Sequence, residues 1–177
     1  YKPQIDIKPE WEMVELGKVC VFEYGKALKE ENRIKGEYPV YGSNGVVGFH
    51  KEFLVEAPFI IIGRKGSAGS VHYSNKNGFL IDTTFFIKLK DEHTIKLLFL
   101  YYILLQLNLD KVNTQSGVPG LNRNDAYRIK IPIPLLSEQE AIVSQIEKEQ
   151  QLVNANKELI KLYEQKIKDE INKLWEE

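Results

Sequence analysis

The chain has 177 residues with 43% hydrophobic and 11% aromatic side chains, which is enough for one globular domain with a hydrophobic core. Its longest apolar run, 97–105, is shorter than the roughly 20 residues of a membrane span, and its single cysteine, Cys20, excludes an internal disulfide, so we expect a cytoplasmic protein. Residues 1–136 carry 18 Lys and Arg against 15 Asp and Glu, whereas residues 137–177 carry 6 against 10, so a weak positive excess lies in the first part.

Residues 1–136 predict an irregular, β-rich domain, and the fold class is therefore α+β. An extended lead-in at 1–10 precedes a short anchor at 11–17, in which Trp11, Val14 and Leu16 are expected core contacts. Runs rich in β-branched and aromatic residues, separated by glycine and asparagine, predict the strands. These runs are 19–22, 38–41, 46–49, 58–63, 70–73 and 84–89.

Helical spacing follows the last of these strands. Residues 94–109 repeat apolar side chains every three or four positions and are apolar nearly all round, which predicts a buried helix. Residues 110–120 are expected to form a loop, 122–128 one helical turn, and 129–133 a short extended exit from the domain.

A glycine-rich stretch at 60–71, I-I-I-G-R-K-G-S-A-G-S-V, lies between two predicted strands. Glycine allows a tight turn and a close approach of the backbone to a ligand. The side chains of Arg64, Lys65 and Ser67, together with neighbouring backbone amides, would therefore suit a phosphate group. The spacing matches neither the Walker A pattern nor the dinucleotide-binding fingerprint, so no nucleotide pocket is expected. The alternative is a hairpin in which the glycines serve turn geometry only.

Three further polar segments contain candidate binding residues. The segment 24–36 is a charged loop with Lys26 and Lys29, and the Asn-Gly pair at Asn44 indicates a β-hairpin. The stretch 113–125 is rich in Asn, Gln and Arg, which are the side chains that pair with DNA base edges. Its candidates are Asn113, Gln115, Ser116, Asn122 and Arg123. For Asn122 or Asn124, the alternative is a role as the N-cap of the helical turn.

The sequence offers little for catalysis. The histidines His50, His72 and His93 do not have metal-ligand spacing, and Cys20 lies in an apolar strand. No serine-nucleophile elbow motif is present. We therefore expect a chain without enzyme activity, bound metal or cofactor.

The last part of the chain, 137–177, predicts one long helix. Ser137 and Glu140 match a capping box, no proline or glycine follows, and apolar residues recur at seven-residue spacing. At 1.5 Å per residue this helix is roughly 57 Å long, which is too long for its apolar stripe to be buried against so small a domain. It therefore predicts pairing with a second helix through Ile146, Val153, Ile160, Tyr163, Ile167 and Leu174.

Together, these motifs resemble those of the specificity subunits of type I restriction–modification systems. The matching stretches span nearly the whole chain in the order of that family. They are W-x4-L-G at 11–17, Y-P-V-Y-G-S-N-G-V-V-G at 38–48, the glycine-rich stretch at 60–71, S-G-V-P-G-L-N-R-N-D at 116–125 and I-P-I-P-L-L-S-E-Q-E at 131–140. The Pro-Pro pair that often precedes the family's helix is Pro134-Leu135 here.

The resemblance implies a DNA target recognition domain, 1–136, followed by a spacer and dimerisation helix, 137–177. Members of the family are non-catalytic scaffolds that read double-stranded DNA and hold adenine methyltransferase subunits, and in the full complex also motor–nuclease subunits. They normally contain two such halves. The single half here fits a half-length subunit that pairs with a second copy, one half of a full-length subunit, or the recognition end of a fused methyltransferase.

We therefore interpret the chain as a sequence-specific DNA-binding module that reads one half of a bipartite target. The stretch with Arg64, Lys65 and Ser67 resembles a pattern shared by proteins with different targets, so we assign it to the phosphate backbone. Base readout is assigned to Lys26, Lys29, Asn113, Gln115 and Ser116. The alternative is a coiled-coil assembly protein whose globular domain binds a partner other than DNA.

Overall fold

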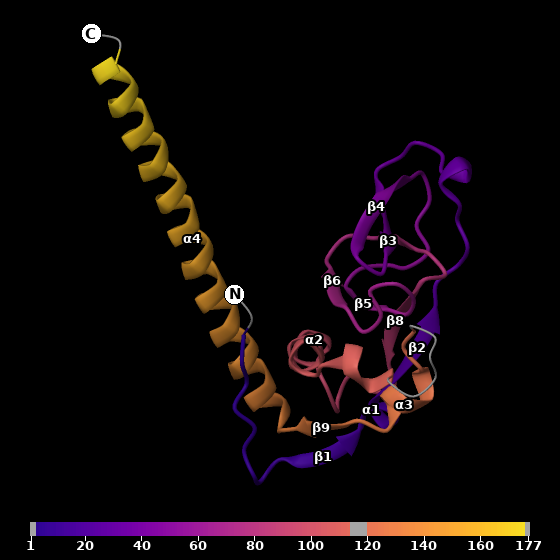
Figure 1. The fold of residues 1–177 in the computed structure, drawn as a ribbon. Coiled ribbons are helices and arrows are strands. Elements are labelled where there is room, and N and C mark those ends of the chain that lie inside the picture. The colour runs from indigo at the N-terminus through magenta and orange to yellow at the C-terminus, as the bar shows by residue number, and fades with distance from the viewer. Residues whose placement is uncertain (1–2, 114–119, 176–177) are drawn as a thin grey trace.

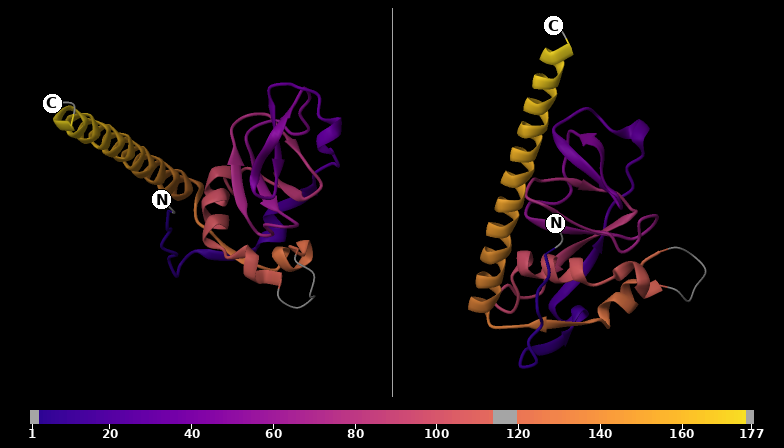
Figure 2. Two further views of the ribbon diagram at one scale, coloured as in Figure 1. Left: turned by 45° about the horizontal axis from the view of Figure 1, so that its top comes forward. Right: turned by 60° about the vertical axis from the view of Figure 1, so that its left-hand side comes forward.

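The computed structural model describes residues 3–113 and 120–175, which form a β-rich domain and one long projecting helix (Figure 1). This helix, α4 (Leu136–Trp175), leaves the edge of the domain and extends beyond it in each view (Figures 1 and 2). The α+β fold class predicted from the sequence is therefore confirmed.

The larger sheet has four antiparallel strands in the order β2-β8-β5-β6. Its inner strand β5 (Phe59–Gly63) is buried at every position and pairs with β6 (Val71–Ser74) on one side and β8 (Thr84–Leu89) on the other. The first strand of this sheet, β2 (Cys20–Tyr24), pairs with β8. The order places the last residues of β2 and β5 beside the first residues of β8, which matters for the loops described below.

A smaller sheet has the order β4-β3-β7. Its strands β3 (Tyr38–Gly42) and β4 (Gly45–His50) form the hairpin that the Asn-Gly pair predicts. The two-residue strand β7 (Phe79–Leu80) pairs with β3 in parallel, and the sequence did not indicate it. A small core joins the two sheets and consists of Tyr41, Phe59, Ile61 and Leu80.

The main core lies between the four-stranded sheet and helix α2 (Leu97–Gln106). Ile60 and Ile62 of β5 face this core, whereas Ile61 between them faces the smaller one, because successive side chains of a strand point to opposite faces. The α2 side chains that fill the main core are Phe99, Leu100, Ile103 and Leu104.

Helix α2 is shorter than the stretch 94–109 predicted from the sequence. The carboxylate of Asp91 accepts hydrogen bonds from the backbone nitrogen of His93 at 2.9 Å and from the hydroxyl of Thr94 at 2.7 Å. Such local bonds stabilise a turn in competition with a helix. The chain therefore turns at 91–94, and α2 begins only at Leu97.

Two short strands close the domain where the chain enters and leaves it. β1 (Glu12–Glu15) pairs antiparallel with β9 (Lys130–Ile133), and the turn α1 (Leu16–Val19) follows β1 directly. Val19, predicted to begin a strand, is therefore the last residue of α1 instead. The anchor residues predicted from the sequence contact the main core as expected; these are Trp11, Val14 and Leu16.

The start of α4 differs from the predicted capping box. The helix begins at Leu136, so Ser137 lies inside the first turn and is not the N-cap. The buried side chain of Gln139 fixes this end of the helix. Its Oε1 accepts a hydrogen bond from the backbone nitrogen of Lys96 at 2.8 Å, and its Nε2 donates to the carbonyl of Pro134 at 2.9 Å.

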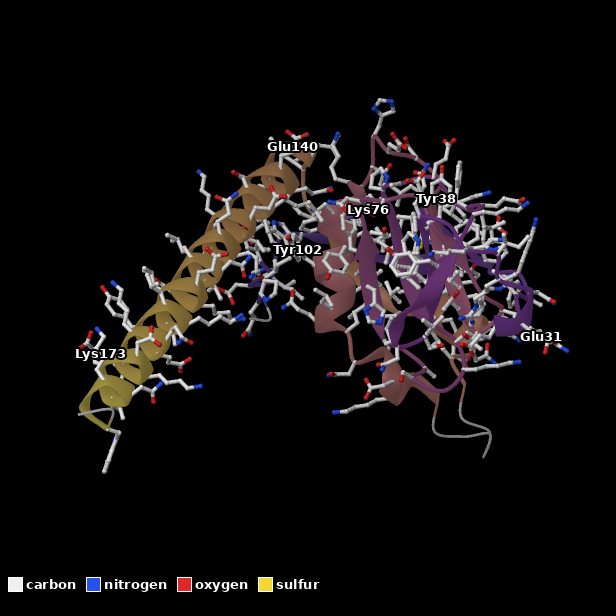
Figure 3. All side chains as sticks on the ribbon, turned by 90° about the horizontal axis from the view of Figure 1, so that it is seen from above. Glu31, Tyr38, Lys76, Tyr102, Glu140 and Lys173 are labelled. Carbon is white, nitrogen blue, oxygen red and sulfur yellow. The ribbon has the colours of Figure 1, made fainter. Side chains whose placement is uncertain are left out.

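The apolar row of α4 is divided between two environments. Ile146, predicted to face a second helix, is only 5% exposed because it packs against the main core of its own domain. Val153 is half-buried, and the helix beyond it projects away from the domain (Figure 3). Ile160, Tyr163 and Ile167 are exposed by 56%, 58% and 60%. The side chain of Leu174 lies outside the described residues.

Within residues 3–113 and 120–175, no helix combines the length and the apolar character needed to cross a membrane.

Candidate nucleic-acid interface

Two loops meet at the carbonyl oxygen of Thr83, just before β8. This oxygen accepts hydrogen bonds from the backbone nitrogens of Arg64 at 2.8 Å and Lys65 at 3.2 Å. It also accepts a hydrogen bond from the hydroxyl of Ser43 at 2.6 Å. Arg64 and Lys65 follow β5, whereas Ser43 lies in the turn between β3 and β4. One peptide carbonyl therefore holds the glycine-rich loop and the hairpin turn together.

The hairpin turn also contacts the glycine-rich loop directly. The carbonyl of Ser43 accepts a hydrogen bond from the hydroxyl of Ser70 and lies 3.3 Å from Nε2 of His72. Asn44 is exposed at the tip of this turn. The structure thus places Asn44 beside the glycine-rich loop, although the two stretches are separate in the sequence.

The glycines of the loop have a structural role, as the alternative interpretation of 60–71 requires. Gly66 and Gly69 have φ angles of +71° and +82°, in a region that strains residues with a Cβ atom. A Cβ on Gly69 would also overlap the backbone of Asp110 in the short helix η2 (Leu109–Asn113). Turn geometry therefore accounts for these two glycines, and it leaves Lys65 and Ser67 exposed on the loop.

The chain returns to this loop at residue 120. Gly120 forms a bridge with Lys65, and the backbone nitrogen of Leu121 donates to the carbonyl of Arg64 at 2.9 Å. Helix α3 (Arg123–Tyr127) starts immediately afterwards. Asn122 is its N-cap, because Oδ1 of Asn122 accepts a hydrogen bond from the backbone nitrogen of Asn124 at 2.9 Å, so the capping alternative is confirmed for Asn122.

The aromatic ring of Tyr24, at the end of β2, lies next to two arginine side chains. The Cζ atom of Arg64 is 4.9 Å from the centre of this ring, and the Cζ atom of Arg123 is 5.1 Å from it. Nη1 of Arg64 donates to the carbonyl of Asp82 at 2.9 Å, and Nη1 of Arg123 donates to the carbonyl of Phe22 at 3.4 Å. Both guanidinium groups are therefore positioned by an aromatic ring and a main-chain carbonyl.

Sequence reasoning identified both arginines but not Tyr24. Tyr24 is 47% exposed and is the last residue of β2, which lies at the edge of the four-stranded sheet. Its position at the boundary between a strand-like run and a charged loop was the signal in the sequence. Its partners, however, come from the loops after β5 and before α3, and no local pattern indicates that pairing.

Two other predicted residues, Lys26 and Lys29, lie on the loop that follows Tyr24. The backbone nitrogen of Lys26 donates to the carbonyl of Leu80 at 2.9 Å, which places Lys26 beside the end of β7. Lys29 lies further along this loop, next to the short helix η1 (Glu30–Asn32), and its Nζ is 3.6 Å from the carboxylate of Glu31. Figure 3 shows Glu31 at the edge of the domain away from α4.

Three predicted residues cannot be placed in this way. Gln115 and Ser116 lie outside the described residues, and Asn113 is described only as the last residue of η2.

The two arginines beside Tyr24 do not form ion pairs with described residues. Among residues 3–113 and 120–175, neither Arg64 nor Arg123 forms an ion pair. Arg128, in contrast, is paired with Asp125 at 3.7 Å at the other end of α3. The α3 end of the domain lies on the side away from α4 in all three ribbon views (Figures 1 and 2).

The described part of the chain contains no group of three or more His, Cys, Asp or Glu side chains that could hold a metal ion. Burial raises the pKa of the Cys20 thiol to about 12, so this thiol is not poised to act as a nucleophile.

A β-rich domain with this topology, followed by a long helix, is the fold of a type I restriction–modification specificity subunit. The chain superimposes on the crystal structure of the S subunit from M. genitalium with a TM-score of 0.74 and 21% identity, over 86% of this chain and 42% of that one. Residues 8–171 match the family described as "Type I restriction modification DNA specificity domain". The chain belongs to this family, which confirms the resemblance read from its motifs.

Two curated relatives carry the name of specificity subunits. The EcoprrI specificity subunit of a type I restriction enzyme from Escherichia coli is 25% identical over 146 residues, which cover 79% of this chain and 36% of the relative. The MjaVIII specificity subunit from Methanocaldococcus jannaschii is 26% identical over 148 residues, which cover 77% of this chain and 35% of the relative. The chain therefore spans about a third of the length of these curated relatives.

Proposed function

We propose that this chain is a DNA-reading specificity module that recognises one half of a bipartite target. In this proposal it catalyses nothing itself, and bound methyltransferase subunits carry out the adenine methylation. The observation that supports it best is the group of loops held around the carbonyl of Thr83, which presents Asn44, Arg64, Lys65 and Arg123 together.

The chemistry of these loops suits DNA. Guanidinium and ammonium groups bind phosphate oxygens, and the exposed hydroxyl of Ser67 adds a further donor. Asn44 is exposed beside them and has the side-chain type that pairs bidentately with adenine. Asn122 already uses its Oδ1 for capping, so we propose that Asn122 chiefly positions α3 and leaves only its Nδ2 group for a base.

The exposed part of α4 supports the second half of the proposal. Beyond Val153 the helix has apolar side chains in solvent, which is typical of a helix that pairs with another one. Its 40 residues correspond to about 60 Å at 1.5 Å per residue, which exceeds one turn of DNA at roughly 34–36 Å. Two recognition domains at opposite ends of a paired rod would therefore read separated half-sites.

The partners follow from this arrangement. A second α4, from another copy or from another half of a longer chain, would complete the rod. Methyltransferase subunits, and motor–nuclease subunits in the full complex, would be held by the assembled module. The relatives are named as parts of restriction enzymes, which supports this proposal.

Binding to duplex DNA at several salt concentrations tests the function. We expect the logarithm of the association constant of the chain, assembled with its methyltransferase, to fall linearly with the logarithm of salt concentration. Lys65→Ala should weaken binding to all duplexes and flatten the salt slope by about one. The matched control is Lys96→Ala, because Lys96 lies near α4 and pairs with Glu140, and its removal should leave the slope unchanged.

Sequence specificity is tested with singly substituted duplexes. Gln115→Ala should reduce discrimination at one base position by about 1–3 kcal/mol and leave the salt slope nearly unchanged. Binding without salt dependence, or no DNA binding at all, would favour the alternative of an assembly protein whose globular domain binds a different partner.

A further inference from the structure

We propose that Tyr24 positions Arg64 and Arg123 as a two-arginine clamp for the phosphate backbone of DNA. The proposal rests on the DNA-reading function proposed above and assigns a role to a residue that the sequence did not single out. It also assigns Arg123, which the sequence named only as a DNA-binding candidate, to phosphate binding.

The first argument is geometric. Each guanidinium carbon lies about 5 Å from the centre of the Tyr24 ring, so the two groups lie within about 10 Å of each other. Successive phosphates on one DNA strand are spaced by 3.4 Å along the helix axis. Two charges within about 10 Å of each other can contact phosphates that are near neighbours on the strand.

The second argument concerns the like charges. Two guanidinium groups this close repel each other, and among the described residues neither of them has a carboxylate within 4 Å. Contacts with aromatic rings offset part of that repulsion, because the ring face attracts a cation. Arg64 also lies 5.9 Å from the ring of Phe85, and Arg123 lies 5.9 Å from the ring of Tyr127. An anion bound between the arginines would remove the remaining repulsion.

The third argument concerns hydrogen-bond donors. A guanidinium group has five N–H donors. Within the described part of the chain, Arg64 donates one of them to the carbonyl of Asp82, and Arg123 donates one to the carbonyl of Phe22 at 3.4 Å. Both groups therefore retain donors for the oxygen atoms of a phosphate.

Phosphate is a better ligand for this pair than a base edge. Bidentate pairing with guanine requires the guanidinium to extend into the major groove. Arg123 is instead bound to the main chain of β2 through the carbonyl of Phe22 and lies against Tyr24 and Tyr127. Held against the main chain in this way, the guanidinium of Arg123 suits a backbone phosphate, which is present at every step of DNA whatever the base sequence.

The test uses the full chain, assembled with its methyltransferase, and duplex DNA of mixed sequence, because phosphate contacts do not depend on the base sequence. Arg64→Ala and Arg123→Ala should each flatten the salt slope of binding by about 0.9. Tyr24→Phe keeps the ring and should bind like the wild type. Tyr24→Leu removes the ring, so it should weaken binding to all duplexes and flatten the slope. The control is Arg128→Ala on the same helix, which should not change the slope.

A comparison of Tyr24→Leu in the wild type and in the variant that lacks both arginines isolates the positioning role of Tyr24. If the ring acts through the arginines, Tyr24→Leu should have no further effect on binding in the Arg64→Ala/Arg123→Ala background. An effect that persists in this background would show that the ring stacks on a base, and it would overturn the clamp. Arg64→Lys and Arg123→Lys keep the charge but lose the planar group, so each should weaken binding even when its melting temperature equals that of the wild type.

The clamp and the proposed function fail in different ways. Salt-dependent DNA binding that is unchanged by all variants of Arg64, Arg123 and Tyr24 would reject the clamp and leave the DNA-reading function in place. A wild-type protein that does not bind duplex DNA at any salt concentration would reject both.

Discussion

The Oε1 atom of Gln139 accepts a hydrogen bond from the backbone nitrogen of Lys96 at 2.8 Å, and this bond ties the first turn of α4 to the residue before α2. The Nε2 atom of the same side chain donates to the carbonyls of Thr94 at 3.0 Å and Pro134 at 2.9 Å. The Gln139 side chain is fully buried. One amide therefore satisfies three main-chain groups at the junction between the domain and the helix.

Replacement of this amide should destabilise the domain. Gln139→Leu keeps a similar volume but leaves the backbone groups of Lys96, Thr94 and Pro134 without their partner, and a buried unsatisfied polar group costs about 1–3 kcal/mol. We expect the free energy of unfolding, measured by chemical denaturation, to fall by at least that amount. Gln145→Leu, at an exposed position of the same helix, should change it by less than about 0.5 kcal/mol. Equal effects of the two substitutions would contradict this role of Gln139.

Charges placed on the exposed stripe of α4 should prevent helix pairing. Val153→Asp combined with Ile160→Asp introduces two carboxylates into a seam in which each buried methylene contributes about 0.8 kcal/mol. Sedimentation should show a loss of assembly, while the melting temperature of the domain stays nearly constant because Ile160 is 56% exposed within the single chain.

The same helix offers a matched control for this experiment. Ser144 and Gln151 are also seven residues apart and exposed, but they lie on the opposite side of α4 from Val153 and Ile160. Ser144→Asp combined with Gln151→Asp should leave assembly intact. A wild-type chain that is monomeric, with no second half joined to it, would exclude the pairing.

The length of the rod makes a prediction about the DNA target. If two identical chains pair through α4, mapping of methylated adenines should show a palindromic pair of half-sites with a fixed gap. If two different halves pair, the two half-sites should differ and the gap should still be fixed. Shortening α4 by seven residues, which is roughly 10 Å, should shorten the permitted gap. A single short, continuous target would contradict the two-ended arrangement.

The ion pair between Lys8 and Glu138 should make the free energy of unfolding depend on pH. Nζ of Lys8 lies 2.6 Å from Oε1 of Glu138, and this hydrogen bond lowers the pKa of Glu138 below its ordinary value of 4.5. A carboxylate with a lower pKa in the folded state stabilises the fold above that ordinary value, and the contribution disappears as the pH falls through the lowered pKa. The difference in unfolding free energy between the wild type and Glu138→Gln should therefore shrink on acidification below pH 4.5.

A second variant separates this pair from other titrating groups. Lys8→Met should lose the same contribution, and the double variant should lose little more than either single one, because both remove one interaction. A difference between the wild type and Glu138→Gln that stays constant into the acidic range would show that the ion pair does not cause it.

The elements that the sequence predicted correctly are those whose signals are local. The strand runs between residues 38 and 89 alternate or accumulate β-branched and aromatic side chains, and each became a strand. The parallel pairing of β7 with β3 depends on contacts between distant segments, so a two-residue strand gave no signal. Ser137 carried a valid local capping pattern, but the tertiary bonds of Gln139 set the start of α4 instead.

The candidate interface was predictable as a set of residue types and not as an arrangement. Arg64 and Lys65 could be recognised because a glycine-rich loop with basic residues is a local pattern. That Arg64 and Arg123 share the ring of Tyr24 follows from the order of β2, β8 and β5, which brings three separate segments to one end of the sheet. Ile146 was predicted to face a second helix because a heptad pattern does not distinguish a partner helix from the helix's own domain.

The carbonyl of Thr83 has a consequence for which substitutions the glycine-rich loop can tolerate during evolution. Two of its three donors are the backbone nitrogens of Arg64 and Lys65, and every residue except proline supplies that donor. Substitutions at these positions alter the surface offered to DNA without releasing the loop from its anchor. The strength of phosphate binding can therefore change through the side chains of Arg64 and Lys65 while their backbone nitrogens keep the loop attached to Thr83.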